Sequence, residues 1–238
     1  PSTSWERENM NVLITGGAGY LGSLLVRRLS GTVKNGEAIR IIVTDIHDQS
    51  FLYKETPIDF VQLDIRSEHV HEVMAKYQVD TVVHLASIVT PGKKSNRELE
   101  YSVDVLGTEN ILKACVNTGV KRIIVSSSGA AYGYHPDNPE WITEDTEIRG
   151  NEEFAYSHHK RLIEQLLAEY RKTHPELEQI IFRIGTILGE TVNNQITALF
   201  EKKALIGISQ SDSPFVFIWD EDVASCLMQA VLGDITGI

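Results

Sequence analysis

Two residues four positions apart could together remove a proton from an alcohol. Tyr156 and Lys160 lie in a segment, 154–170, whose apolar residues recur with a helical period, so their side chains share one face one turn apart. A free tyrosine has a pKa of about 10, and only on the order of a thousandth of it is ionised at neutral pH. Lowering that pKa by roughly three units requires about 4 kcal/mol of preferential phenolate stabilisation. An ammonium group one turn away can supply much of this in a partly desolvated site.

The same spacing also fits an ordinary exposed pair in which Tyr156 only packs, and spacing alone favours that second interpretation. Two other features of the chain favour chemistry. One is a glycine-rich turn near the N-terminus, and the other is an apolar run, 121–128, that ends in three serines. Together they indicate that Tyr156 acts as a general base.

The glycine-rich turn follows the first apolar run of the chain. Gly16, Gly19 and Gly22 match the GxxGxxG variant of the dinucleotide-binding fingerprint. The missing side chains allow a sharp turn, close approach of a pyrophosphate and tight packing of helix on strand. The helix that begins at Tyr20 and Leu21 would direct its free N–H groups at the phosphates. An ordinary glycine-rich turn is the alternative.

A carboxylate ends the next apolar run. Asp45 follows Gly22 by 23 residues, close to the roughly 20 expected for the acid that binds the adenosine ribose hydroxyls. A carboxylate there would repel a 2′-phosphate, and no arginine follows immediately. We therefore expect the cofactor NAD rather than NADP. The alternative is a solvated carboxylate at the end of a strand.

A third strand is predicted over residues 59–65, and it also ends beside an acid. Asp64 and Ile65 could contact the adenine of the dinucleotide. Asp64 and Ser67 fit equally well as capping residues of the helix predicted next.

A fourth strand is predicted over residues 81–87, and it is almost wholly apolar, as buried parallel strands are. Leu85, Ala86 and Ser87 would border the cofactor, because small side chains allow close approach of the backbone. His84 is expected to be a hydrogen-bonded core histidine, since no second metal-type residue stands at a coordinating spacing. We expect no metal site.

Strands and helices alternate along the whole chain. A helix is predicted from about Asn96 to Thr118, and the strands over 121–128 and 179–184 enclose the helix that carries Tyr156. This order predicts the α/β class: a doubly wound parallel sheet, or Rossmann fold, with a small C-terminal substrate-binding region. We expect a dinucleotide-binding domain over 1–185. Residues 186–238 are expected to form a partial substrate-binding region interleaved with the last Rossmann elements.

The composition excludes some partners. The 238 residues carry a formal charge of −11, which disfavours nonspecific binding to nucleic acid or to an anionic membrane. No apolar run is long enough to span a bilayer, and residues 2–9 lack the apolar core of a signal peptide. Cys115 and Cys226 both lie in apolar helical contexts and are expected to be buried free thiols. A soluble, cytoplasmic protein is predicted.

Four motifs in order resemble the extended short-chain dehydrogenase/reductase family, in its NAD-dependent epimerase/dehydratase group. They are Thr15–Gly22, His84–Ser87, Ser126–Ser128 with Tyr132-Gly133, and Tyr156-x-x-x-Lys160. The resemblance extends from about Met10 to the C-terminus. It implies an enzyme in which Tyr156 takes a hydroxyl proton while hydride passes to the nicotinamide. Lys160 would hold the nicotinamide ribose, and Ser128 would hydrogen-bond the reacting oxygen.

The resemblance also implies a substrate class and an assembly. The substrate would be a sugar hydroxyl, first of all on a nucleotide-linked sugar, and Arg183 would lie where the substrate-binding region begins. A surface arginine at a strand end is the alternative there. A homodimer would form through the helices after Asn96 and Phe154, although their apolar stripes are equally explained by packing on the sheet.

The chain departs from the family pattern at three places. Asp104 stands where the pattern NVxGTxN has Asn, so the support of Lys160 is altered. Gly129-Ala130 stands where dehydratases carry Asp-Glu, which disfavours elimination of water. The sequence also ends at Ile238, where relatives usually continue, so we expect either a shortened chain or a reduced substrate-binding region.

Other functions fit the same motifs. A simple sugar, uronate or alcohol dehydrogenase would use the same three catalytic residues. A non-catalytic NAD-binding sensor would need the glycine turn but not the base, and the presence of Ser128, Tyr156 and Lys160 argues against it.

Overall fold

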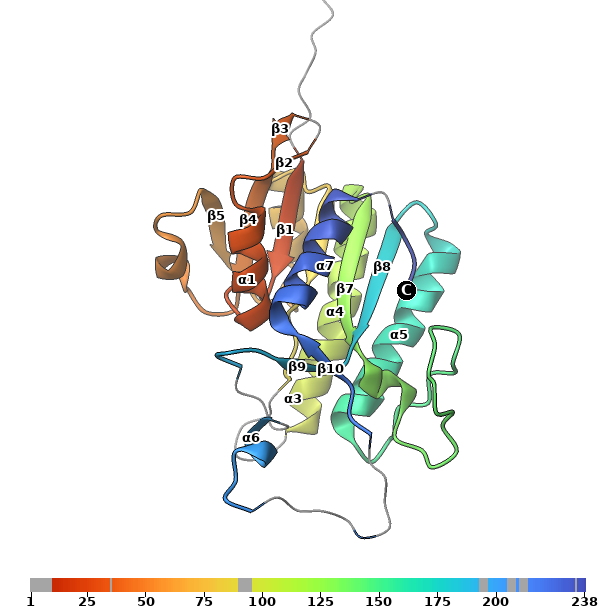
Figure 1. The fold of residues 1–238 in the computed structure, drawn as a ribbon. Helices are drawn as coiled ribbons and strands as arrows, with labels where there is room; N and C mark the ends of the chain where they lie inside the picture. The colour runs from red at the N-terminus through yellow and green to blue at the C-terminus, as the bar shows by residue number, and fades with distance from the viewer. Residues whose placement is uncertain are drawn as a thin grey trace, which may run out of the picture.

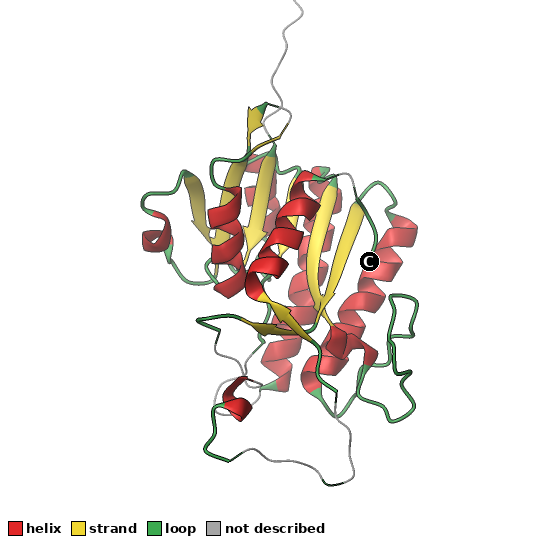
Figure 2. Ribbon diagram, viewed as in Figure 1, coloured by secondary structure: helices red, strands yellow, loops and turns green. Residues whose placement is uncertain are grey.

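A parallel sheet of six strands forms the middle layer of the protein (Figures 1 and 2). The computed structural model describes residues 10–34, 36–89, 96–192, 197–204, 209, 214–233 and 235–238. The strands, in spatial order, are β5 (Ile58–Gln62), β4 (Arg40–Asp45), β1 (Asn11–Thr15), β6 (Thr81–His84), β7 (Arg122–Ser128) and β8 (Glu178–Ile184). From β1 the chain first adds strands toward one edge of the sheet and then, from β6 on, toward the other edge, as in a doubly wound Rossmann sheet. The predicted fold class is therefore confirmed.

Helices cover both faces of the sheet (Figure 1). On the face toward the viewer lie α1 (Tyr20–Leu29) and α7 (Asp220–Leu232). On the other face lie α2 (His69–Lys76), α4 (Gly107–Thr118) and α5 (Ala155–Thr173). Because both faces are covered, the middle of each central strand is an apolar run, and Val12, Leu13 and Ile14 of β1 are wholly buried.

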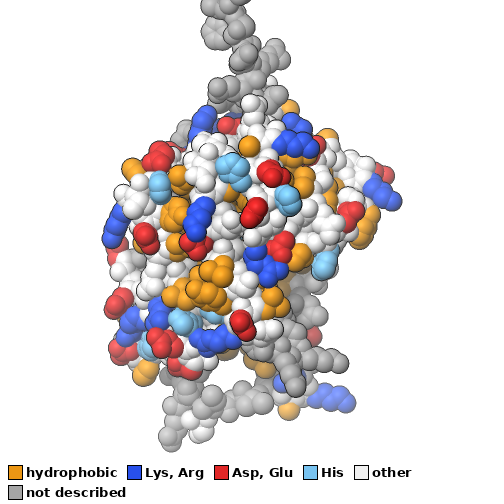
Figure 3. Space-filling view, turned by 180° about the vertical axis from the view of Figure 1, so that it is seen from behind, with side chains coloured by type: hydrophobic (Ala, Val, Ile, Leu, Met, Phe, Trp, Pro, Cys, Tyr) orange, Lys and Arg blue, Asp and Glu red, His pale blue; other side chains and the backbone are white. Residues whose placement is uncertain are grey.

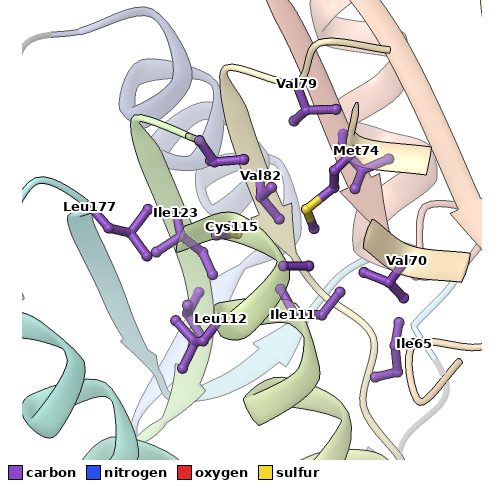
Figure 4. Close-up of a cluster of buried hydrophobic side chains, with 14 of the residues drawn as sticks. Ile65, Val70, Met74, Val79, Val82, Ile111, Leu112, Cys115, Ile123 and Leu177 are labelled. Carbon is purple, nitrogen blue, oxygen red and sulfur yellow. The ribbon is translucent and has the colours of Figure 1, made fainter. Parts of the chain in front are cut away.

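Two hydrophobic cores result, one on each side of the sheet. Leu25 and Leu29 of α1 pack with Val223 and Leu227 of α7 on the front side. Figure 4 shows the other core, in which α2, α4 and the strands β6 and β7 bury Met74, Ile111, Leu112, Cys115 and Ile123. Helix α7 thus lies beside α1 on the sheet. The boundary predicted at residue 185 stays a prediction.

The helix predicted from Asn96 to Thr118 consists of three consecutive pieces. They are α3 (Arg97–Tyr101), the π-helical turn η2 (Ser102–Leu106) and α4. Asn96 caps the start by accepting a hydrogen bond from the Leu99 N–H, and Gly119, at φ +74°, ends the last piece. The π turn lies in the middle and contains Asp104. Single π turns inside α-helices occur frequently at functional sites.

Small elements surround the sheet. The hairpin of β2 (Val33–Lys34) and β3 (Glu37–Ala38) was not predicted, and the 3₁₀ turns are η1 (Ser50–Tyr53) and η3 (Gly129–Tyr132). The short parallel pair β9 (Thr186–Leu188) and β10 (Phe217–Trp219) lies with α6 (Thr197–Phe200) beyond the carboxyl ends of the main strands, at the bottom of Figure 1. At the C-terminus, Gly237 makes a parallel bridge to Ile180 of β8.

The cysteine prediction is half right. Both thiols are free and Cys115 is buried, but Cys226 is exposed, because its position on α7 faces away from the apolar stripe that packs on the sheet. Within the described ranges, no helix is both long and apolar enough to cross a bilayer. The same residues contain no group of three or more His, Cys, Asp or Glu side chains arranged to hold a metal ion. The segment tested for a signal peptide, residues 2–9, lies outside the described residues.

Candidate active site

The glycine turn packs so tightly that Gly16 and Gly22 have no room for a side chain. Gly16 has φ +62°, and a Cβ there would lie 2.8 Å from the Ala86 Cα. A Cβ on Gly22 would lie 2.5 Å from the Gly17 Cα. The turn therefore presents bare backbone beside the end of β6, as the fingerprint predicts.

Helix α1 starts directly after this turn and has an open N-terminus. Gly19 is its N-cap residue, and no side chain caps it. The N–H groups of Tyr20 and Leu21 belong to the first turn, which has no intrahelical acceptors, so they can bind an anion. The Tyr20 hydroxyl itself donates to the Asp220 carboxylate, so Tyr20 would contact a dinucleotide through its backbone.

Asp45 lies at the end of β4, beside the glycine turn. Its Oδ2 accepts a hydrogen bond from the Ala18 N–H at 3.2 Å, and the Gly17 N–H donates to the Thr44 carbonyl at 3.1 Å. The carboxylate is therefore held at the edge of the turn, the place predicted for a ribose-binding acid.

Each of the two residues predicted to contact adenine has a partner within the protein, Asp64 at the surface and Ile65 in the interior. Asp64 forms an ion pair with Arg66, with 2.6 Å between Oδ2 and Nη2. The Ile65 side chain is buried against Gly107, where a Cβ would lie 2.6 Å from the Ile65 Cδ1. Any adenine contact at Ile65 would thus come from its backbone, and the role of both residues stays a prediction.

The predicted base and its lysine lie next to the end of β6. The Lys160 Nζ stands 5.4 Å from the centre of the Tyr156 ring and donates to the Ser87 Oγ at 3.5 Å and to the Ser126 carbonyl at 3.3 Å. Lys160 is buried, with 4% of its surface exposed. Because Ala86 touches Gly16, an unbroken series of contacts joins the glycine turn to the Tyr156 side chain.

Ser128 ends β7 and begins the turn η3. Its Oγ accepts a hydrogen bond from the Ala130 N–H at 3.1 Å. The Ser157 hydroxyl donates to the Ala130 carbonyl at 2.6 Å, so the first turn of α5 is bound to the same turn. The fold therefore brings the neighbourhoods of Ser128 and Tyr156 together, and Leu85 follows β6 at the same edge.

His84 is a satisfied core residue, as predicted. Its Nδ1 lies 2.7 Å from the Thr15 Oγ1 and its Nε2 lies 3.0 Å from the Thr108 Oγ1. Burial, with a smaller effect of the Lys160 charge, lowers the pKa of His84 to about 3. The imidazole is therefore neutral and ties β1 and β6 to α4.

This buried imidazole is expected to make the protein acid-sensitive. In the unfolded chain His84 has its ordinary pKa of 6.5, whereas in the folded protein its pKa is about 3. The stabilisation is therefore complete above the unfolded value and is lost as the pH falls through this window, by up to about 1.4 kcal/mol per pH unit. Guanidinium unfolding at a series of pH values should show a shallower acid loss in His84→Gln.

The matched control is His71→Gln, because His71 is exposed on α2 and its change should leave the slope as it was. Burial also lowers the pKa values of His158 and His159, so the comparison with the parent protein is the informative quantity. Equal slopes for the parent and the His84 variant would contradict the prediction.

Arg183 is neither a surface residue nor free. Its side chain is 9% exposed and pairs with both carboxylate oxygens of Glu164, at 3.0 and 3.1 Å. Its Nη1 donates to the Tyr132 hydroxyl and to the Glu144 carbonyl, each at 2.8 Å, and Ser127 donates to Glu164 at 2.6 Å. The surface alternative is therefore wrong, and a role in substrate binding stays a prediction.

The sequence motifs did not point to several residues that hold the site. Tyr53 donates a buried hydrogen bond to the Gly17 carbonyl at 2.5 Å, and Glu164 anchors Arg183. Asp220 holds the Tyr20 side chain from a position 200 residues away. None of these residues belongs to a local pattern, so only spatial proximity could reveal them.

Comparison with known proteins finds relatives that resemble this chain in sequence and in fold. The chain is 30% identical over 193 residues to the UDP-glucose 4-epimerase of Caenorhabditis elegans. This alignment covers 76% of this chain and 55% of that protein. It also resembles the solved UDP-glucose 4-epimerase of Thermus thermophilus in complex with NAD. That likeness has a TM-score of 0.76 and 25% identity, and it covers 96% of this chain and 76% of the other.

The UDP-glucose 4-epimerase of Brucella ovis, solved in complex with NAD, gives a TM-score of 0.75 at 26% identity, over 93% of this chain and 73% of that one. The chain spans 55 to 60% of the length of several curated relatives that it matches. The family model described as "NAD dependent epimerase/dehydratase family" matches residues 12–231, which include the glycine turn, the Ser128 strand and the Tyr156 helix. With a family match over nearly its whole length, this chain belongs to the NAD-dependent epimerase/dehydratase family.

Proposed function

We propose that this protein uses NAD to act on a hydroxyl of a nucleotide-linked sugar, and that the reaction is an epimerisation. The observation that carries the proposal is the unbroken contact from Gly16 through Ala86 and Ser87 to Lys160 and Tyr156. It puts an amine and a phenol at the edge of a backbone cradle suited to a dinucleotide. The relatives named UDP-glucose 4-epimerase support the same substrate class.

The described residues fit NAD at this place. The cradle at Gly16 and Gly22 has no room for a Cβ, and the uncapped start of α1 offers backbone N–H groups to a pyrophosphate. Asp45 stands at the edge of the turn, where its carboxylate would bind ribose hydroxyls and repel a 2′-phosphate, so we infer NAD rather than NADP. When bound, NAD supplies the hydride acceptor and donor.

The residues of this chain have separate roles in the proposed reaction. Tyr156 accepts the proton of the sugar hydroxyl, and the Lys160 ammonium stabilises the phenolate that accepts it. Ser128 donates a hydrogen bond to the reacting oxygen and keeps it near Tyr156. Because Gly129 and Ala130 bring no acidic side chain to this turn, elimination of water is not proposed.

The test is a panel of UDP-, GDP- and dTDP-sugars and free uronates, each with NAD and with NADP. An epimerase returns its hydride, so the product sugar forms without net NADH. A dehydrogenase accumulates reduced nicotinamide, which its absorbance reveals. Product from a nucleotide sugar without net NADH supports the proposal, whereas binding of NAD without turnover of any panel member would favour a sensor.

We also infer a homodimer formed through α3, η2 and α5. Leu99, Tyr101 and Leu106 are exposed apolar residues on these elements. Figure 3 shows hydrophobic side chains gathered in the middle of this back face, with charged and histidine side chains around them. A hollow of about 390 Å³ between α3 and α5 lies on the same elements. Light scattering should give twice the chain mass, and a monomer at micromolar concentration would refute the dimer.

We infer a cytoplasmic location from the two free cysteines, one of which is exposed.

A further inference from the structure

A buried carboxylate lies beside the proposed active-site lysine. Asp104, in the π turn η2, is 2% exposed, and its Oδ1 accepts a hydrogen bond from the Ile88 N–H at 2.8 Å. The Ser87 hydroxyl also hydrogen-bonds to the Asp104 side chain. Since the Lys160 Nζ donates to the same Ser87 oxygen, Ser87 stands directly between the ammonium and the carboxylate.

The charges around this carboxylate come from several elements. Glu100 of α3 lies one turn earlier in the chain, His84 faces it from β6 in the neutral form, and Lys160 brings a positive charge from α5. Asp104, His84 and Lys160 line one small cavity of about 10 Å³ with Ser87. The Lys160 charge therefore acts on Asp104 across a small cavity that both residues line.

Burial of a charge is unfavourable unless a partner compensates it. The pKa of Asp104 is raised, first by burial and to a smaller extent by the Glu100 charge, while the Lys160 charge and the hydrogen bonds from Ile88 and Ser87 oppose that rise. These three groups all favour the ionised carboxylate.

We propose that Asp104 acts on the reaction through its charge: the Asp104 carboxylate, linked to Lys160 through Ser87, weakens the stabilisation that the Lys160 ammonium gives to the Tyr156 phenolate. This proposal rests on the proposed function, in which Lys160 stabilises the Tyr156 phenolate. A carboxylate near the ammonium opposes part of that stabilisation by Coulomb repulsion of the phenolate. The protein therefore operates at a higher pH than it would with a neutral amide at residue 104.

The first test is the pH dependence of turnover of a nucleotide sugar by the holoprotein. Asp104→Asn keeps the shape and can still accept from the Ile88 N–H through its amide oxygen, but it removes the charge. The acid limb of the pH–rate profile should move down by about one pH unit, the order of effect of one unit charge at an effective dielectric constant of about 20. On that limb, the variant should be up to about tenfold faster than the parent.

Glu109→Gln is the matched control. Glu109 lies on α4, two residues after the start of that helix, and pairs with Lys113 at the surface. Its replacement removes the same charge from the same chain segment, and screening by solvent should leave the acid limb unmoved. Asp104→Ser, a second neutral variant, should move the limb in the same direction as Asp104→Asn and guards against a folding defect in either one.

A second measurement does not depend on turnover. The ultraviolet phenolate absorbance of Tyr156 can be titrated as the difference between each protein and its own Tyr156→Phe counterpart, without substrate. The phenolate should form at lower pH in the Asp104→Asn pair than in the parent pair. If the parent turns over no nucleotide sugar, the proposed function fails, yet this titration still decides the role of Asp104.

The overturning result is equally definite. If the folded Asp104→Asn and Asp104→Ser proteins give the parent's phenolate titration and acid limb, then Asp104 is uncharged or its charge does not reach Tyr156.

Discussion

Replacing Tyr156 with phenylalanine is expected to lower the rate of the proposed sugar epimerisation by about 10²–10⁴-fold. The change removes a single oxygen, so the ring keeps its contact with the Lys160 ammonium, which lies 5.4 Å from the ring centre. The sugar hydroxyl then has no positioned base to take its proton. Binding of NAD should change less than about threefold, because the glycine turn and Asp45 are untouched.

The rate is measured as product sugar formed per enzyme, and NAD binding by calorimetry. Tyr170→Phe is the matched control, since Tyr170 lies on the same helix α5 and loses the same hydroxyl near the other end of that helix. Its rate should equal that of the parent. Hydride transfer above about a hundredth of the parent rate in the Tyr156 variant, a loss smaller than the roughly 10²-fold expected of a general base, would remove Tyr156 from the mechanism.

Replacing Arg183 with methionine is expected to reduce the free energy of unfolding by about 3–5 kcal/mol. Glu164 would remain buried, with 3% of its side chain exposed and the Ser127 hydroxyl as its hydrogen-bond donor. A buried carboxylate without its guanidinium partner is far more unfavourable than the loss of a surface ion pair. Urea unfolding followed by circular dichroism gives the difference.

Two comparisons make this prediction specific. Arg40→Met breaks the ion pair between Arg40 and Asp59, in which the two side chains are 51% and 37% exposed. It should change the free energy of unfolding by about 1 kcal/mol or less. The double variant Arg183→Met/Glu164→Leu removes both buried charges and should recover most of the loss. A single Arg183 variant as stable as the Arg40 variant would show that the buried pair does not stabilise the fold.

Local patterns in the sequence were sufficient for the architecture. Each strand of the sheet contains a short apolar run with β-branched members, and each covering helix has an apolar stripe, so neighbouring residues alone define the elements. Their alternation leaves a doubly wound parallel sheet as the natural arrangement. Glycine spacing predicted the turn at Gly16, because only glycine fits that backbone against Ala86.

The tertiary structure decided the surroundings of the predicted residues. Lys160 meets Ser87 across 73 positions, and Tyr20 meets Asp220 across 200, so no local pattern could link them. The π turn that contains Asp104 reads as plain helix in the sequence, because one widened turn hardly changes the apolar period. The residue types and their order were therefore predictable from near neighbours, whereas the partner of each buried charge depended on how distant elements pack.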